Sequence, residues 1–157
     1  MKKIALKLSL VLFVSLSFTA CQDDNKKEKT EVETLQQKFD KNMKETVAIH
    51  DEVMPKMAEI NKLHADLEVQ SPKMDDEEYQ RASAMLEEAH MEMMSWMKKF
   101  SNSFDSKEVN SGISTENVDD LKAKNELLDQ FKTSAESMQT NINRSLEHGR
   151  ELHKRYE

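Results

Sequence analysis

Methionine and histidine are the residue types in this chain that could do chemistry as a group. The chain has 11 methionines in 157 residues, and two groups of them include a histidine. Within each group the members recur every three or four residues, which places their side chains on one side of a helix. The first group comprises His50, Met54 and Met57, with His64 two turns on, and the second comprises His90, Met93, Met94 and Met97.

Thioether sulfur and imidazole nitrogen are ligands that suit Cu(I), and facing helices are a usual place to assemble a metal site. If the two helices run antiparallel about a turn near Pro72, His50 lies level with Met94 and Met54 lies level with His90. The two groups then share one layer, which predicts a site for Cu(I) or another soft cation. Its ligands would come from His50, Met54, Met57, His90, Met93, Met94 and Met97.

A simpler interpretation competes with this hypothesis and is preferred on the sequence alone. Methionine is a flexible core filler, and these positions overlap an apolar stripe that must be buried anyway. No cofactor is then expected. Haem bound by a His and Met pair is a third alternative, although the chain has no Cys-x-x-Cys-His attachment motif.

The start of the chain predicts a signal peptide over residues 1–20. Lys2 and Lys3 form a basic start, an apolar stretch follows, and Thr19 and Ala20 are small residues of the kind that precede a cleavage site. A membrane-spanning helix needs about 20 apolar residues, and this stretch is shorter and is interrupted by polar side chains. We expect it to be removed on export.

Residues Phe18 to Cys21 resemble a bacterial lipobox, in which the cysteine is diacylated and becomes the mature N-terminus. Cys21 is the only cysteine, so disulfides and thiolate metal sites are excluded from the mature domain. The next residues, Gln22 to Asn25, resemble the short acidic signal that sends many Bacteroidota lipoproteins to the outer face of the outer membrane. We expect an outer-membrane lipoprotein exposed at the cell surface, with a periplasm-facing anchor as the alternative.

The rest of the chain predicts helices that would position the histidines and methionines. Residues 21–30 are charged and lack apolar periodicity, so they predict a flexible tether. Apolar residues then recur at helical spacing over residues 31–70. Pro55 removes one backbone hydrogen bond from that helix and predicts a kink or break near Met54.

Two further helices are expected after the first. Ser71 as N-cap and Pro72 in the first turn predict a second helix over residues 72–104. Residues 105–113 predict a loop, and Ser114 or Thr115 then caps a third helix over residues 114–156. Trp96 falls on the apolar side of the second helix and is expected in the core.

These elements predict an all-α fold, an elongated antiparallel three-helix bundle of up-down-up topology over residues 31–157. A dimer of long helical hairpins is the alternative. With only two glycines and two prolines, the chain has little turn chemistry for strands.

The charge balance limits the partners. The whole chain has 23 Lys and Arg against 30 Asp and Glu, and three of the lysines belong to the predicted signal peptide. The mature part therefore carries about ten net negative charges, which argues against nucleic acid and anionic lipid as partners. The expected partners are the membrane, through the lipid, and a protein partner or a second copy of the chain.

Two stretches carry a resemblance to a known group. The residues from His50 to Met57, and those from Ala89 to Met97, are similar to small Flavobacteria-type lipoproteins of the Bacteroidota, commonly labelled viral A-type inclusion protein. The resemblance covers the lipobox and the first two helices, and it implies no established activity, cofactor or catalytic residue. No catalytic motif is visible either, so the expected function is non-catalytic, a helical binding or spacer module of the cell envelope.

Overall fold

The computed structural model describes residues 21–157, and the regular elements of this part are all helical, which confirms the all-α class there. The predicted signal peptide, residues 1–20, lies outside the described residues. No helix within residues 21–157 combines the length and the apolar character needed to span a bilayer. The elements are α1 (Cys21–Val53), α2 (Lys56–Gln70), the 3-10 helix η1 (Ser71–Lys73), α3 (Asp76–Ser103), α4 (Ser106–Ser111) and α5 (Val118–Tyr156).

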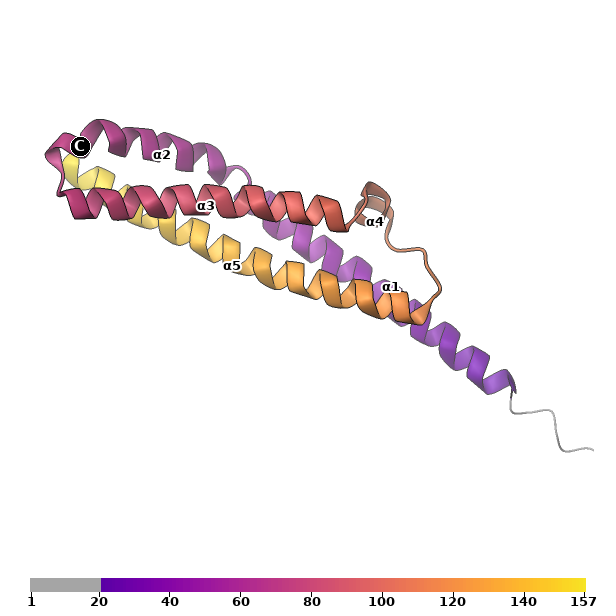
Figure 1. Ribbon diagram of the computed structural model, residues 1–157. Helices are drawn as coiled ribbons and strands as arrows, with labels where there is room; N and C mark the ends of the chain where they lie inside the picture. The colour runs from indigo at the N-terminus through magenta and orange to yellow at the C-terminus, as the bar shows by residue number, and fades with distance from the viewer. Residues whose placement is uncertain (1–20) are drawn as a thin grey trace, which may run out of the picture.

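The long helix α5 is the element against which the others pack (Figure 1). α1 and α2 follow one another along α5 and run in the same direction as it. Their cross-helix contacts therefore advance together along both chains, from Lys38 with Asp129 in α1 to Glu59 with Arg150 in α2. α3 runs the opposite way, and its first turn lies beside the last turn of α5, where Arg155 contacts Glu78.

The break between α1 and α2 lies where proline predicts it. α1 ends at Val53 and α2 begins at Lys56, because Pro55 has no N–H to continue the helical ladder. The Met54 N–H still donates to the His50 carbonyl at 2.8 Å, so the last turn of α1 is closed. Val53 and Met57 are both buried, so the apolar stripe continues across the break.

The N-terminal end of α1 corrects the expected flexible tether, because the backbone of residues 21–30 is helical. This segment contains neither Gly nor Pro, and adding residues to an existing helix is easy compared with starting one. Its described side chains from Lys26 to Glu31 are exposed. In Figure 1 this indigo end of α1 extends past the start of α5, so it projects from the packed body as a helix.

The start of α3 also differs from the prediction. Ser71 and Pro72 form the 3-10 turn η1, and α3 begins four residues later than expected, at Asp76. Its N-cap is Asp75, whose carboxylate accepts hydrogen bonds from the N–H groups of Glu77 and Glu78 at 3.0 and 3.2 Å. The carboxylate of Asp75 caps two free N–H groups at the positive end of the helix dipole, which a hydroxyl at Ser71 cannot do from its place in the 3-10 turn.

The expected loop at 105–113 contains the short helix α4 instead. Asp105 and Glu108 form a capping box: the Asp105 carboxylate accepts from the Glu108 N–H at 2.8 Å, and the Glu108 carboxylate accepts from the Asp105 N–H at 3.0 Å. Gly112 ends α4 with a φ of 81°, a conformation that side chains disfavour. The sequence signal for α4, Asp three residues before Glu, is present but is only four residues long.

The N-cap of α5 is Asn117, whereas Ser114 or Thr115 was expected from the sequence. The Asn117 side-chain oxygen accepts from the Asp120 N–H at 3.0 Å, and α5 begins at Val118. Thr115 has another role, since its carbonyl accepts from the Gln36 side chain at 3.0 Å and so connects the α4–α5 loop to α1.

The core forms two joined clusters along α5. The larger one lies among α2, α3, α5 and the end of α1, and the smaller one lies around Phe39, Met43, Phe104 and Leu128. Phe100 and Phe131 are packed against both clusters and join them. Trp96, 6% exposed, belongs to the larger cluster, which confirms it as a core residue.

Candidate functional site

The seven predicted metal ligands are divided between core and surface. Met57 and Met93 are 8% and 0% exposed and belong to the larger core cluster. Met54 and Met94 are 42% and 51% exposed. Met97 is partly buried against the same cluster. The sequence pattern treats all of these methionines alike, whereas the structure turns two of them outward, so they do not form a single inward-facing set.

His50 has the most distinctive surroundings of the seven. Its Nδ1 lies 3.0 Å from the Asp51 carboxylate, and its Nε2 is buried without a hydrogen-bond partner among the described residues. The imidazole ring stacks on the indole of Trp96, with 5.9 Å between ring centroids and 19° between planes. Sequence reasoning did not single out Asp51 or Trp96 for this site, although Asp51 directly follows the histidine.

The other histidines differ in what their rings contact. His90 also buries one ring nitrogen, Nδ1, without a partner in the described part of the chain, and His148 of α5 does the same outside the predicted site. His64 of α2 is satisfied, because its Nε2 lies 2.9 Å from the Ser83 hydroxyl of α3. His64 therefore links two helices, and an unpaired ring nitrogen alone does not distinguish a ligand.

The ring contact of His50 differs from the expected pairing of His50 with Met94. The His50 ring stacks on Trp96, which lies two residues, or about 3 Å along the helix axis, beyond Met94, the residue expected to be level with His50. Side chains on a helix lean toward its N-terminus. Because α1 and α3 run in opposite directions, His50 leans toward the C-terminal end of α3 and His90 leans the other way.

Because their side chains lean in opposite directions, the rings of His50 and His90 lie at different levels along the helix axes. Trp96 marks the level of His50, and His90 lies six residues before it in α3, about 9 Å along the helix axis. The seven residues therefore do not surround one point. Among residues 21–157 there is also no group of three His, Cys, Asp or Glu side chains that could hold a metal ion.

Two of the buried polar residues fix the register between α1 and α5. Asn42, 9% exposed, donates to the Asp129 carboxylate at 2.5 Å. Asn125, 2% exposed, donates from its side chain to the carbonyl of Leu35 in α1 at 3.0 Å. Burying an amide without a partner costs free energy, so a sliding of α1 along α5 is disfavoured.

Charged pairs continue this alignment at the surface. Lys122 pairs with Glu31 at 2.7 Å near the start of α5, and Lys132 pairs with Glu45. The hydrogen bond from Lys132 holds the pKa of Glu45 below its ordinary value, and the same bond raises the pKa of Lys132. Each exposed pair contributes little stability by itself, because solvent and salt screen the attraction.

The strongest of these pairs joins α2 to α5. The Arg150 guanidinium donates through two nitrogens to both carboxylate oxygens of Glu59, at 2.6 Å each. This bidentate bond lowers the pKa of Glu59 and raises that of Arg150. The fork geometry adds orientation as well as attraction, so this pair fixes the angle at which α2 lies along α5.

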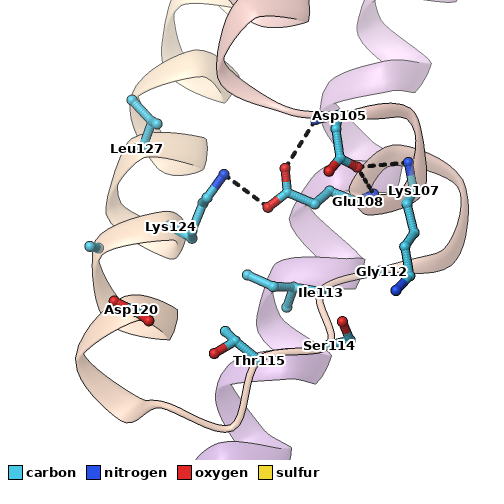
Figure 2. Close-up of a pocket in the computed structure, with 11 residues that line it drawn as sticks. Asp105, Lys107, Glu108, Gly112, Ile113, Ser114, Thr115, Asp120, Lys124 and Leu127 are labelled. Carbon is cyan, nitrogen blue, oxygen red and sulfur yellow. Dashed lines mark hydrogen bonds and ion pairs between the residues drawn. The ribbon is translucent and has the colours of Figure 1, made fainter.

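A surface hollow of about 510 Å³ lies between the α4 turn and the start of α5 (Figure 2). Its polar groups already bind one another: Lys124 pairs with Glu108 at 2.8 Å and donates to the Ser103 carbonyl at 3.1 Å. The backbone N–H of Glu108 lowers the pKa of Asp105 on the same wall. Apolar side chains, among them Ile113 and Leu127, form much of the rest. This hollow was not predicted, because the segment that forms it was expected to be a simple loop.

Three kinds of comparison were made with known proteins. Neither the models of protein families, nor the curated proteins, nor the solved structures include a match to this chain.

Proposed function

We propose that this chain is a non-catalytic lipoprotein of the bacterial cell envelope. Cys21 carries the lipid, the signal peptide before it is removed, and the helices form an elongated up-down-up three-helix bundle that acts as a spacer or a protein-binding module. The supporting observation is the path of α1, which is helical from Cys21, the first described residue, and runs directly into the packed body. The resemblance to Flavobacteria-type lipoproteins is part of this proposal.

The dimensions of the helices support a spacer. α1 has 33 residues and α5 has 39, so at about 1.5 Å per residue they are about 50 and 58 Å long. The segment of α1 before Glu31 extends past the start of α5 (Figure 1), and its side chains from Lys26 to Thr30 are exposed. A lipid at Cys21 would then hold the body at a distance from the bilayer, with the α2–α3 connection at the far end.

The polar contacts along α5 support a body of fixed shape. Pairs recur from Glu31 with Lys122 near one end to Glu59 with Arg150 toward the other. Exposed pairs favour one register over its neighbours even where each adds little stability. A spacer or a docking scaffold needs this property, because its binding surface must stay at a defined height.

Fractionation of cells of the producing bacterium tests the anchor. The chain should fractionate with the outer membrane, and Cys21→Ser should move it out of that fraction, because the variant cannot receive a lipid. Protease added to intact cells should digest the parent chain if the anchor is on the outer face. Survival of the chain in intact cells, with digestion only after the outer membrane is opened, would support the periplasm-facing alternative.

The choice between spacer and binding module has its own test. Met91 and Met94 are 61% and 51% exposed on α3 and are outside the core clusters. Replacing both by Gln should leave the melting temperature unchanged, because neither side chain is buried in the body. A module that docks a protein partner, or a second copy of the chain, through this surface should lose that association in a crosslinking assay. A chain that acts only as a spacer should behave like the parent in the same crosslinking assay.

Soft-metal binding is the second proposed function, with Cu(I) as the ion. One observation favours it: a ring nitrogen of His50 is buried beside the Trp96 ring, with no hydrogen-bond partner among residues 21–157. Imidazole and thioether are a ligand set that selects Cu(I) over harder ions. Titration with Cu(I) in competition with a chromogenic chelator tests this function, and failure to compete at any ratio would exclude it.

A further inference from the structure

The hydrogen bonding of His50 prepares one ring nitrogen as a ligand. The Asp51 carboxylate lies 3.0 Å from Nδ1, and an ionised carboxylate can only accept, so Nδ1 carries the hydrogen. In the neutral ring Nε2 then has a free lone pair, and this atom is buried without a donor among the described residues. Metal-binding histidines usually donate their other N–H to a carboxylate or carbonyl in this way.

Trp96 supplies a fixed aromatic face at the same place. Its indole N–H is held by α5, with the Ser134 hydroxyl at 3.0 Å and the Phe131 carbonyl at 3.3 Å. The ring therefore cannot turn away from His50, which stacks on it. A cation near the face of an indole is attracted by the electrons of the ring. An ion in the plane of the imidazole would lie alongside the nearly parallel indole.

Two methionines lie next to His50 and Trp96 along the chain. Met54 follows His50 by one closed turn, since its N–H donates to the His50 carbonyl, and this spacing brings the two Cβ atoms to about 5–6 Å. Met97 directly follows Trp96 and is partly buried beside it, in contact with the core cluster that contains Trp96. Met54 is 42% exposed, so an incoming ion has a path from solvent.

We propose that His50 Nε2 and the sulfurs of Met54 and Met97 bind one soft monovalent ion, Cu(I), beside Trp96. This inference rests on the second proposed function and does not depend on the lipid anchor. Asp51 is a positioning residue that fixes the ring of His50. The remaining four of the seven residues are not ligands in this proposal. Met57 and Met93 fill the core, His90 lies about 9 Å along the α3 axis from the level of Trp96, and Met94 follows His90 by one helical turn.

The test uses the whole chain in detergent with Cys21→Ser, because a free thiolate would compete for Cu(I). Trp96 is the only tryptophan, so its fluorescence reports on this site alone. Titration with Cu(I), and with Ag(I) as a redox-inert substitute, should quench the fluorescence and reach a plateau at one ion per chain. No quenching and no competition with the chelator would overturn both the site and the soft-metal function.

Matched histidine variants separate the site from the function. His50→Leu should weaken binding by more than about 100-fold, since loss of a supporting residue alone typically weakens binding 10–100-fold. His90→Leu should bind with the affinity of the parent. If the parent binds but His50→Leu binds equally well, soft-metal binding stands and this site is wrong. Circular dichroism of both variants without metal checks that each is folded.

A variant at Met54 keeps the test valid if His50→Leu does not fold. Met54→Leu changes an exposed side chain, so the fold should be retained, and affinity should fall by about tenfold or more. Met94→Leu, which also changes an exposed side chain, is its control and should leave the affinity unchanged. Equal affinity of both variants and the parent would overturn the assignment of Met54.

The role of Asp51 is tested by two substitutions. Asp51→Asn keeps a side-chain oxygen that can accept from His50 Nδ1, and Asp51→Ala removes it. Affinity should fall about 10–100-fold for Asp51→Ala and clearly less for Asp51→Asn. A residue with only a structural role would change the melting temperature in both variants and leave the ratio of their affinities at one.

Discussion

Gly149 is the position where the packing of the helices can be tested most sharply. It is buried in α5, and a Cβ added there would lie 2.6 Å from Leu63 Cδ2 in α2 and 3.3 Å from Leu86 Cδ1 in α3. Side chains of two neighbouring helices, α2 and α3, therefore lie directly against α5 at this glycine. Elsewhere in a helix interior, replacing Gly by Ala stabilises by about 0.5–1 kcal/mol.

Gly149→Ala should nevertheless destabilise the chain. The added methyl must displace the Leu63 side chain, and overpacking of this kind costs about 1–3 kcal/mol. After the gain in helix propensity is subtracted, the free energy of unfolding should fall by about 1 kcal/mol. This change corresponds to a melting temperature lower by about 3–6 °C. Urea unfolding of the parent and the variant, with equal slopes, measures this difference.

A double-mutant cycle identifies Leu63 as the cause. Leu63→Ala alone should cost about 2–5 kcal/mol, because it leaves a cavity at this crossing. In that background Gly149→Ala should stabilise, since the new methyl enters the cavity, and the two changes should couple by about 1–2 kcal/mol. Stabilisation of the parent by Gly149→Ala, with no coupling to Leu63, would refute the close approach of α2 to α5.

The other predictions concern charge and backbone. The pKa of Glu59 is lowered in the folded chain by Arg150, so the stability from this pair is present above the unfolded pKa of about 4.3 and is lost as pH falls through the folded value. Glu59→Gln should therefore lower the melting temperature at pH 7 and have no effect near pH 2 in a thermal scan. Asp105→Ala should remove the cap of α4 and speed amide exchange in α4 while exchange in α5 stays slow, as hydrogen exchange can measure. Gly112→Ala should cost about 1–2 kcal/mol in urea unfolding, because φ is 81° and a Cβ would collide with the Asp40 carboxylate; equal stability would contradict this backbone.

The class of fold and the break in the first helix follow from local rules. Apolar periodicity marks the helices because burial of one stripe drives their formation, and Pro55 ends α1 since it cannot donate a backbone hydrogen bond. The tether was mispredicted for a related reason. The lack of apolar periodicity in residues 21–30 indicates that this segment is not part of the core. A helix that is already formed can nevertheless continue through it.

The short connections were harder to predict because several residues can cap a helix there. Ser71, Asp75, Ser114 and Asn117 are all good caps by type, and the choice depends on where the neighbouring helices meet. Sequence reasoning also missed two buried polar residues that align the helices. Asn42 and Asn125 interrupt an apolar stripe in sequence, and only their partners on the other helix show that they belong to the core.

The candidate site was predicted in its residue types and not in its geometry. Helical spacing places Met54 and Met94 beside histidines, but spacing alone cannot tell a core position from a flanking one. The alignment of His50 with Trp96 depends on the lean of side chains in antiparallel helices, which counting residues from a turn omits. The contribution of Asp51 is a hydrogen bond that only the ring orientation reveals.

The measurement that tests the central claim most directly is the mass of the N-terminal peptide of the chain purified from membranes of the producing bacterium. We predict a peptide that begins at Cys21 and carries a diacylglycerol thioether, from which mild alkali removes the ester-linked chains. A peptide that begins at Met1, or one that contains Cys21 without a lipid, would contradict the proposed lipoprotein.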